Sequence, residues 1–335
     1  MKVNTHIQKL AYPEYASLSS KSARVDLAQH KSRYQEHVYT LSQDKDLIKK
    51  IAQMENVEEE NILITAGADG ALHHIAETFL DEGKVAVIPL PAFGRFEFHT
   101  KITGAKPIFV KHKKFPHSFD LKIITKIAQN KKAELIFLAN PNNPTGELIR
   151  KKHLKNFIQD NPSRLIAIDE VLVEDMRDSA CELVNIYKNL IVIKSFSKLF
   201  EIPGLRVGYI VTNPQLRNLI GKNVSPYEIS SLSLNFLKRL VFINTDLDKR
   251  KRELRQARDL LRKEISLSLS NTDASVALIK AEKGNSLFEY LLKHGILAVD
   301  GKMFRGLEKT NTVRVVINNV SDIKKLIRII KKYNK

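Results

Sequence analysis

The sequence predicts an α/β protein with a mostly parallel central sheet covered by helices and a smaller α+β region. From about residue 60, short strands that are apolar throughout alternate with helical patterns, which is typical of a parallel sheet covered on both faces. After about residue 215 the pattern changes to two long helical stretches followed by shorter mixed elements. The chain has 335 residues, of which 43% are hydrophobic, so it can form a large core.

The first region divides into strands and helices by the spacing of its apolar residues. Strands are expected at 61–65, 84–90, 105–112, 133–140, 164–170, 190–195 and 206–212. Helices are expected at 68–80, 121–130 and 150–161, where Leu, Ile and Phe recur at helical spacing. In an open sheet of this kind, ligands bind beyond the carboxyl ends of the strands.

The second region has a different order of elements. Helices are expected at 233–243, 247–266, 285–296 and the C-terminus, and strands at 275–281, 295–299 and 312–317. We therefore expect an N-terminal arm, or part of the small domain, at 1–39, a large cofactor-binding domain at 40–215, and a small domain at 216–335.

Composition narrows the function classes. The net charge is +18, but the densest basic stretches, 247–263 and 322–335, have Leu and Ile at helical spacing, so their charges are expected on the wet faces of helices. No nucleic-acid-binding motif is recognised, and a nucleic-acid partner is not expected. The single cysteine, Cys181, excludes an internal disulfide, and the histidines have no metal-ligand spacing. No membrane segment or secretion leader is recognised, so the protein is expected in the cytoplasm.

Polar residues follow four of the expected strands. Ala-Gly-Ala-Asp-Gly-Ala-Leu follows the first strand at 66–72, and Asn-Pro-Asn-Asn-Pro-Thr-Gly follows another at 140–146. Asp169 and Glu170 follow a third, and Ser-Phe-Ser-Lys follows a fourth at 195–198. Because these strands are expected to be parallel, their carboxyl ends meet at one edge of the sheet.

These residue types suit one cofactor. The amine of Lys198 can form a Schiff base with an aldehyde. The hydroxyls of Ser195 and Ser197, the guanidinium of Arg206 and the start of the first helix can hold a phosphate. The carboxylate of Asp169 can keep a pyridine nitrogen protonated. Together they predict pyridoxal 5′-phosphate, whose ring is an electron sink.

Four motifs, in one order and spacing, carry a resemblance to a known family. They are NPNNPTG at 140–146, the Asp-Glu pair at 169–170, SFSK at 195–198 and GLRVGY at 204–209. With them the chain resembles the fold-type I, pyridoxal-phosphate-dependent aminotransferases of class I/II, over roughly residues 38–320. It is most similar to the branch of histidinol-phosphate aminotransferases and threonine-phosphate decarboxylases.

The resemblance implies a role for each matching residue in the chemistry. Lys198 would form the aldimine with the cofactor and would move the Cα proton of the substrate. Asp169 would pair with the pyridine nitrogen, and Asn143 would bond to the ring oxygen O3′. Arg314 would bind the α-carboxylate of the substrate, and Phe93 would stack on the ring.

The resemblance also implies how the phosphate is held. Ser195, Ser197, Arg206 and the backbone at Ala68 and Asp69 would surround it. In this family the active sites form at the interface of a homodimer, and Tyr39 of one subunit would reach the phosphate in the other. The implied function is transfer of an amino group between an amino acid and a 2-oxo acid by a ping-pong mechanism.

Two positions depart from the family pattern. Leu172 stands where relatives usually carry a tyrosine whose hydroxyl shares O3′, so Asn143 would act alone. Asp300 stands where the histidinol-phosphate branch has an arginine that grips the substrate, which argues against a phosphorylated substrate. Lys302 or Arg305 could supply the missing charge.

Simpler interpretations remain open. Lys198 could be a surface lysine, Asp169 or the serines helix caps, Asn143 a turn residue, and Phe93 a core residue. The two arginines and Tyr39 could be structural, and His73 and His74 are expected to be packing or surface residues. A decarboxylase or lyase of the same fold, or a non-catalytic binding protein with a basic surface, would carry much of the same sequence.

Overall fold

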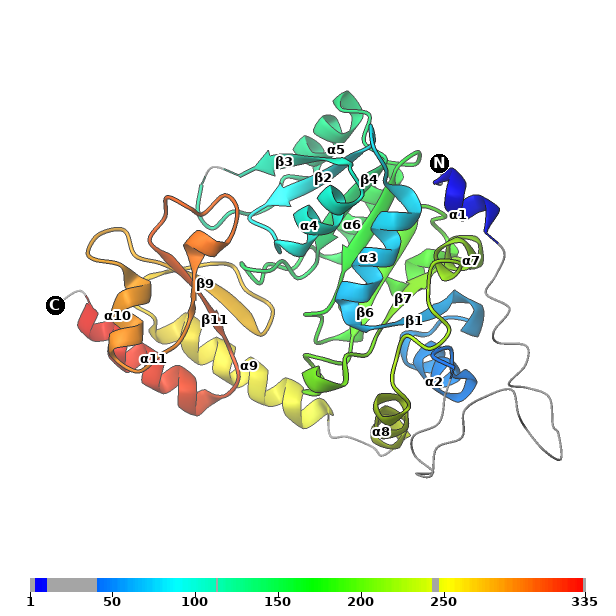
Figure 1. Ribbon diagram of the computed structural model, residues 1–335. Coiled ribbons are helices and arrows are strands. Elements are labelled where there is room, and N and C mark those ends of the chain that lie inside the picture. Colours follow the sequence, from blue (N-terminus) through cyan, green and yellow to red (C-terminus); the bar gives the residue numbers. More distant parts are fainter. Residues whose placement is uncertain (1–3, 11–40, 113, 243–246, 334–335) are drawn as a thin grey trace.

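A computed structural model describes residues 4–10, 41–112, 114–242 and 247–333, and these form two sheets with their helices (Figure 1). The larger sheet has seven strands in the order β1-β7-β6-β5-β4-β2-β3. Only β7 runs antiparallel to its neighbours. The strands are β1 Ile62–Thr65, β2 Val85–Leu90, β3 Lys106–Lys111, β4 Leu135–Ala139, β5 Leu165–Asp169, β6 Leu190–Ser195 and β7 Gly208–Thr212.

Helices cover both faces of the seven-stranded sheet. On one face, α2 (Lys45–Glu55), α5 (Leu121–Asn130), α6 (Lys151–Gln159) and α8 (Ser231–Phe242) contribute to the core. On the other face lie α3 (Gly67–Phe79), α4 (Arg95–Ile102) and α7 (Pro214–Gly221). Apart from the edge strand β3, the strands are buried along nearly their whole length because both faces are covered.

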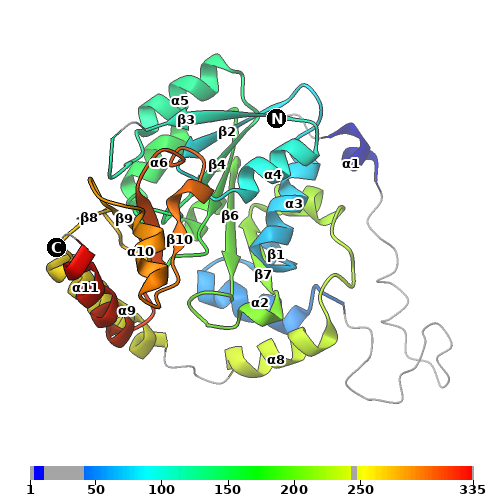
Figure 2. The same cartoon turned by 60° about the vertical axis from the view of Figure 1, so that its left-hand side comes forward.

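The smaller sheet is antiparallel, in the order β10-β11-β9-β8. Its strands are β8 Ser268–Leu269, β9 Val276–Lys280, β10 Val299–Asp300 and β11 Thr312–Val316. One face packs on α9 (Leu247–Glu264), α10 (Leu287–Lys293) and α11 (Val320–Tyr333). Figure 2 shows α9 and α11 side by side next to the smaller sheet, and α9 also contacts the loops after β5 and β6 through the Arg258–Glu174 and Arg250–Glu201 salt bridges.

Shorter elements complete the fold. They are α1 (Thr5–Lys9) and the 3-10 turns at Glu59–Asn61, Met176–Asp178, Cys181–Asn185, Pro203–Leu205 and Gly301–Met303. Within the described ranges, no helix has both the length and the apolar character needed to cross a membrane.

The structure confirms the predicted fold class and refines its elements. The sequence did not indicate α2, α4 or α7. The strand expected at 295–299 is reduced to β10, and Leu297 before it is 81% exposed. Leu216 and Leu234, which follow the predicted boundary at 215/216, pack in the cores around the larger sheet. The three-part division of the chain stays a prediction.

Candidate active site

Lys198 lies in the loop after β6, at the carboxyl edge of the larger sheet. Partial burial and the charges of Arg314 and Arg206 lower the pKa of its amine, while the charge of Asp169 acts in the opposite direction. These three residues come from different segments, so the loop brings Lys198 within electrostatic reach of each. A lowered pKa increases the fraction of neutral, nucleophilic amine.

Asp169 ends β5 beneath this loop and is 8% exposed. Burial is the main cause that raises the pKa of its carboxyl to about 6, and the charge of Glu170 raises this pKa further. A hydrogen bond from the Val171 N–H and the charge of Lys198 act in the opposite direction. The Val171 bond, at 3.0 Å, belongs to a turn. The next helical turn is capped by Asp175, so Asp169 is not its cap. A buried carboxylate of this kind favours a cationic partner.

The start of α3 forms a cradle with Arg206. No side chain caps the amino end of α3, so its first N–H groups remain available to an anion. A Cβ on Gly67, which has φ +71°, would lie 2.9 Å from Nη2 of Arg206, and a Cβ on Gly208 would lie 2.7 Å from the Gly67 carbonyl carbon. The two glycines therefore let β7 and Arg206 approach the helix closely. Within the described chain Arg206 forms no salt bridge.

The two serines lie at the end of β6. The Ser195 hydroxyl donates to Oγ of Ser197 at 3.0 Å and accepts from the Ser197 N–H at 3.1 Å. Ser195 is paired with Gly208 across β6 and β7, and a Cβ on Gly208 would also lie 2.9 Å from the Ala68 nitrogen. The serine end of β6 is thus next to the start of α3.

Asn143 and Arg314 meet between the two sheets. The loop at 140–146 is fixed by its other amides: Asn140 bonds to the Ile149 backbone, and Asn142 bonds to the Pro91 carbonyl. The Asn143 Oδ1 accepts from Nη1 of Arg314 at 3.3 Å. Burial lowers the pKa of Arg314, and its Nε is buried without a partner in the described chain. Arg314 thus retains donors for a carboxylate.

Two other candidates have mainly structural contacts. Phe93, at the end of β2, is half-buried and packs edge-on to Phe96 with ring centroids 6.1 Å apart. The Asp69 side chain pairs with Arg95 at 2.6 Å and with His99 at 3.0 Å, so only its backbone is left for a ligand at α3. Tyr39 lies outside the described residues.

The two departures from the family pattern have structural consequences. Leu172 is buried with Ala274 and Val276, so it packs the loop after β5 against the smaller sheet. It also lines a cavity of about 270 Å³ beside Lys198. Asp300 accepts from the Lys302 N–H at 3.0 Å and caps the turn that follows. Arg305 is held by both carboxylate oxygens of Glu97, at 2.6 and 2.8 Å.

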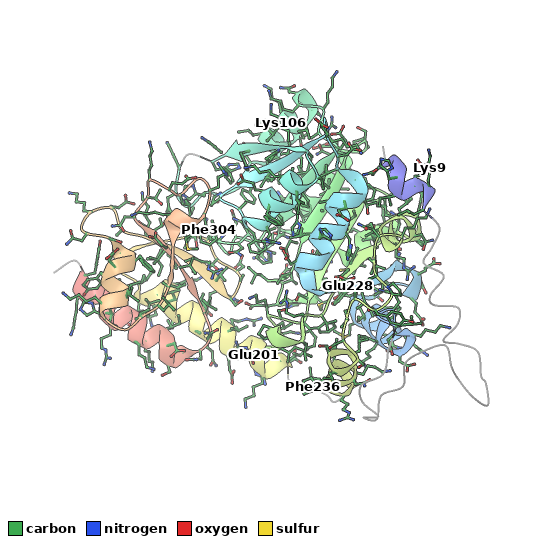
Figure 3. The ribbon with its side chains drawn as sticks, viewed as in Figure 1. Lys9, Lys106, Glu201, Glu228, Phe236 and Phe304 are labelled. Atoms are coloured by element: carbon green, nitrogen blue, oxygen red, sulfur yellow. The ribbon has the colours of Figure 1, made fainter. Side chains whose placement is uncertain are left out.

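One neighbour of the cradle was not found from the sequence. Glu228, labelled beside the start of α3 in Figure 3, accepts from the Ala66 N–H at 3.0 Å and from His74 Nε2 at 3.1 Å. His74 is therefore a buried partner of Glu228. Because 162 residues separate Ala66 from Glu228, no local pattern could have indicated this contact.

The set fits pyridoxal phosphate. An uncapped helix start with an adjacent arginine and two hydroxyls suits a phosphate dianion. A buried carboxylate suits a protonated ring nitrogen, and an amine of lowered pKa suits an aldehyde. Within the described ranges no three His, Cys, Asp or Glu side chains are grouped to hold a metal ion.

Comparison with known proteins agrees with this fit. A histidinol-phosphate aminotransferase from Thermoanaerobacter sp. (strain X514) is 30% identical over 292 residues, which are 85% of this chain and 81% of that relative. The relative of the same name from Methanocaldococcus jannaschii is 29% identical over 310 residues, 88% of this chain and 81% of that relative.

Solved structures share the fold. The histidinol-phosphate aminotransferase from Sinorhizobium meliloti, solved in complex with pyridoxal-5′-phosphate, has a TM-score of 0.79 at 20% identity, covering 88% of this chain and 82% of that one. The L-threonine-O-3-phosphate decarboxylase from Porphyromonas gingivalis has a TM-score of 0.71 at 22% identity, covering 88% and 92%. The family model for aminotransferase class I and II matches residues 5–330. The chain therefore belongs to the class I and II aminotransferases, the pyridoxal-phosphate-dependent enzymes of fold type I.

Proposed function

We propose that Lys198 is the residue through which this aminotransferase binds its cofactor and moves the proton at the substrate Cα. The observation that carries the proposal is the position of Lys198 within electrostatic reach of Asp169, Arg206 and Arg314. Those three groups suit the ring nitrogen, the cofactor phosphate and the substrate carboxylate, respectively. The amine would therefore lie between the sites for cofactor and substrate.

The cofactor would be held from both ends. Arg206, Ser195, Ser197 and the first N–H groups of α3 would bind the phosphate. Asp169 would keep the ring nitrogen protonated, and Asn143 would donate to the ring oxygen O3′. Bound there, pyridoxal phosphate supplies a ring that accepts the electron pair released at Cα.

Arg314 would orient the amino acid. Its guanidinium can bind the α-carboxylate through two parallel hydrogen bonds, which fixes the plane of the substrate. This orientation would point the Cα proton at Lys198. The neutral amine of Lys198 would take that proton and deliver it to the C4′ carbon of the cofactor. An amino acid and a 2-oxo acid would thus use the same carboxylate site in turn.

The donor we propose has a side chain without phosphate. The curated relatives are named for histidinol phosphate, but Asp300 replaces the arginine of that branch, and Arg305 is engaged by Glu97. A phosphate would therefore meet a carboxylate rather than a free guanidinium at this position. The cytoplasmic location, and a homodimer in which the partner's Tyr39 reaches the phosphate, are further parts of the proposal.

Two measurements test the assignment. The protein loaded with cofactor is reduced with borohydride and digested, and the pyridoxyl group should be found on the peptide that contains Lys198. A panel of amino acids, with histidinol phosphate and O-phosphoserine as phosphorylated members, is then followed by visible absorbance. The spectrum of pyridoxamine phosphate identifies the donors. A label on another residue would disprove the role of Lys198, and release of CO₂ without an oxo acid would indicate a decarboxylase.

A further inference from the structure

A second lysine, Lys194, lies four positions before Lys198, inside β6 rather than in the loop that follows it. It is 6% exposed and belongs to β6. Side chains alternate between the faces of a strand, so Lys194 points to the same side as Val192, which packs in the core beneath α2, α5, α6 and α8. Nothing proposed above for the cofactor explains a charged group buried there.

Lys194 lies between two buried carboxylates. Its Nζ is 3.3 Å from Oε2 of Glu170 and 3.7 Å from Oε2 of Glu55. The other Glu55 oxygen accepts from the Tyr209 hydroxyl at 2.5 Å. Glu170 also accepts from the Ser179 hydroxyl at 2.6 Å and, through its other oxygen, from the Ala180 N–H at 2.7 Å.

These contacts join the strands that carry the candidate active site. Glu170 directly follows Asp169, and Lys194 directly precedes Ser195. Tyr209 lies opposite Lys194 across β6 and β7, next to the Gly208 that contacts the start of α3. The ammonium group therefore joins β6 to the residue after β5 and to Glu55 at the end of α2, and Glu55 in turn reaches the start of β7 through Tyr209.

The cluster sets one cation against two carboxylates. In the described part of the chain, Lys194 is the single cation in a salt bridge with either carboxylate. Burial opposes its charge, but the carboxylates of Glu170 and Glu55 outweigh this effect, so the pKa of Lys194 is raised. Burial raises the pKa of the Tyr209 hydroxyl and of the Cys181 thiol. Lys194 therefore stays charged and the two neighbours stay neutral near pH 7.

We propose that Lys194 is a positioning residue that, through Glu170, Glu55 and Tyr209, holds the ends of β5, β6 and β7 in the register that aims Asp169 at the cofactor ring. The inference rests on the proposed function, because it assumes that Asp169 meets the ring. Without the ammonium group, Glu170 either keeps a charge that repels the charge of Asp169 or takes a proton and weakens its bonds to Ser179 and Ala180. Either result would alter the surroundings of the Asp169 carboxylate, although Lys194 itself does not contact Asp169.

The test compares Lys194→Met and Lys194→Arg with a control, Leu154→Ala. Leu154 is fully buried on α6 in the same core but makes no contact with the cluster by hydrogen bond or ion pair. The cofactor-free full chain is titrated with pyridoxal phosphate, and the visible absorbance of the loaded protein is followed against pH. Thermal unfolding of the cofactor-free form is measured in parallel.

Lys194→Met should raise the cofactor dissociation constant about tenfold or more and shift the absorbance midpoint by about one pH unit. In Lys194→Arg the dissociation constant should lie within about threefold of wild type, and the absorbance midpoint within about 0.3 pH unit of it. Leu154→Ala should lower the unfolding temperature but leave the dissociation constant and the midpoint unchanged, because it opens a cavity away from the site.

If Lys194→Met does not fold, Glu170→Gln/Lys194→Met removes a buried charge of each sign and takes its place. The proposal is wrong if the folded variant binds cofactor and titrates as the control does. A pyridoxyl label on a residue other than Lys198 in the wild-type protein would instead disprove the proposed function. If the label is on Lys198 but the Lys194 variants bind cofactor and titrate as the wild type does, the proposed function stands and only this inference is wrong.

Discussion

Two lysines of one short segment, Lys194 and Lys198, lie in opposite environments. Lys194 is buried between two carboxylates, which raise its pKa. Lys198 lies in a loop beside Arg206 and Arg314, and partial burial with these cations lowers its pKa. The same side chain is thus held as a permanent cation on one face of the sheet and shifted toward the neutral amine beyond the strand end. Position relative to the sheet, more than residue type, separates the structural lysine from the reactive one.

The largest expected effect is on activity at the reactive lysine. Lys198→Ala should lower kcat/KM for transamination by about 10³-fold or more, because the variant loses both the covalent contact and the acid–base group. Its free energy of unfolding should stay within about 0.5 kcal/mol of wild type, since Lys198 is exposed as a residue and its amine is only partly desolvated by its neighbours. Turnover assays and denaturant unfolding measure the two quantities. Full activity in the variant would remove the distinction between the two lysines.

A substitution of the structural lysine, Lys194, should affect stability strongly, in contrast to a substitution of Lys198. Lys194→Met is expected to lower the free energy of unfolding by about 3–5 kcal/mol, because it leaves two buried carboxylates without their cation. Lys198→Met is the matched control and should change stability little. Denaturant unfolding of the cofactor-free proteins compares them directly. Equal stability in the two variants would mean that one of the buried carboxylates is neutral in the folded protein.

A third test asks whether the cations around Lys198 have separate tasks. Arg314→Lys should raise KM for the amino donor by about 10- to 100-fold with a smaller change in kcat, because a lysine cannot form the two parallel bonds to a carboxylate. Arg305→Lys is the control, since Arg305 is held by Glu97. A similar rise of KM in both variants would place Arg305 in the substrate site as well.

The sequence was informative at the positions where polar, chemically reactive residues directly follow the predicted strands. The strands were visible as apolar runs, and the rule that ligands bind at their carboxyl edge directed attention to Asp169, Lys198 and the loop at 140–146. The structure brings Asp169, Arg206 and Arg314 within electrostatic reach of Lys198. Their roles toward the cofactor and the substrate stay predictions.

What the sequence did not indicate depends on contacts between distant segments. Glu228 reaches the start of α3 from a loop far along the chain, and Glu55 reaches Lys194 from α2. A local signal for Lys194 did exist, because a charged residue inside the apolar strand LIVIKS must find a partner. The strand expected at 295–299 was overestimated, since β10 pairs with β11 at only Val299 and Asp300.

The smallest expected effect is a pH dependence of stability that belongs to Asp169. Its folded pKa of about 6 lies above the value of 3.8 for an unperturbed carboxyl, so the folded, cofactor-free protein binds a proton that the unfolded chain releases. The stabilisation is complete below about pH 4 and is lost as the pH rises through about 6, in total about 3 kcal/mol. Between pH 5 and pH 7.5 the loss should be about 1 kcal/mol.

Asp169→Asn isolates this contribution, because the amide is neutral at every pH. The difference in unfolding free energy between wild type and the variant, without cofactor, should shift by about 1 kcal/mol in favour of the variant from pH 5 to pH 7.5. With cofactor bound, the protonated ring nitrogen would favour the ionised carboxylate, so the wild type should regain the advantage at pH 7.5. A difference that does not change with pH would show that Asp169 is ionised in the folded protein throughout this range.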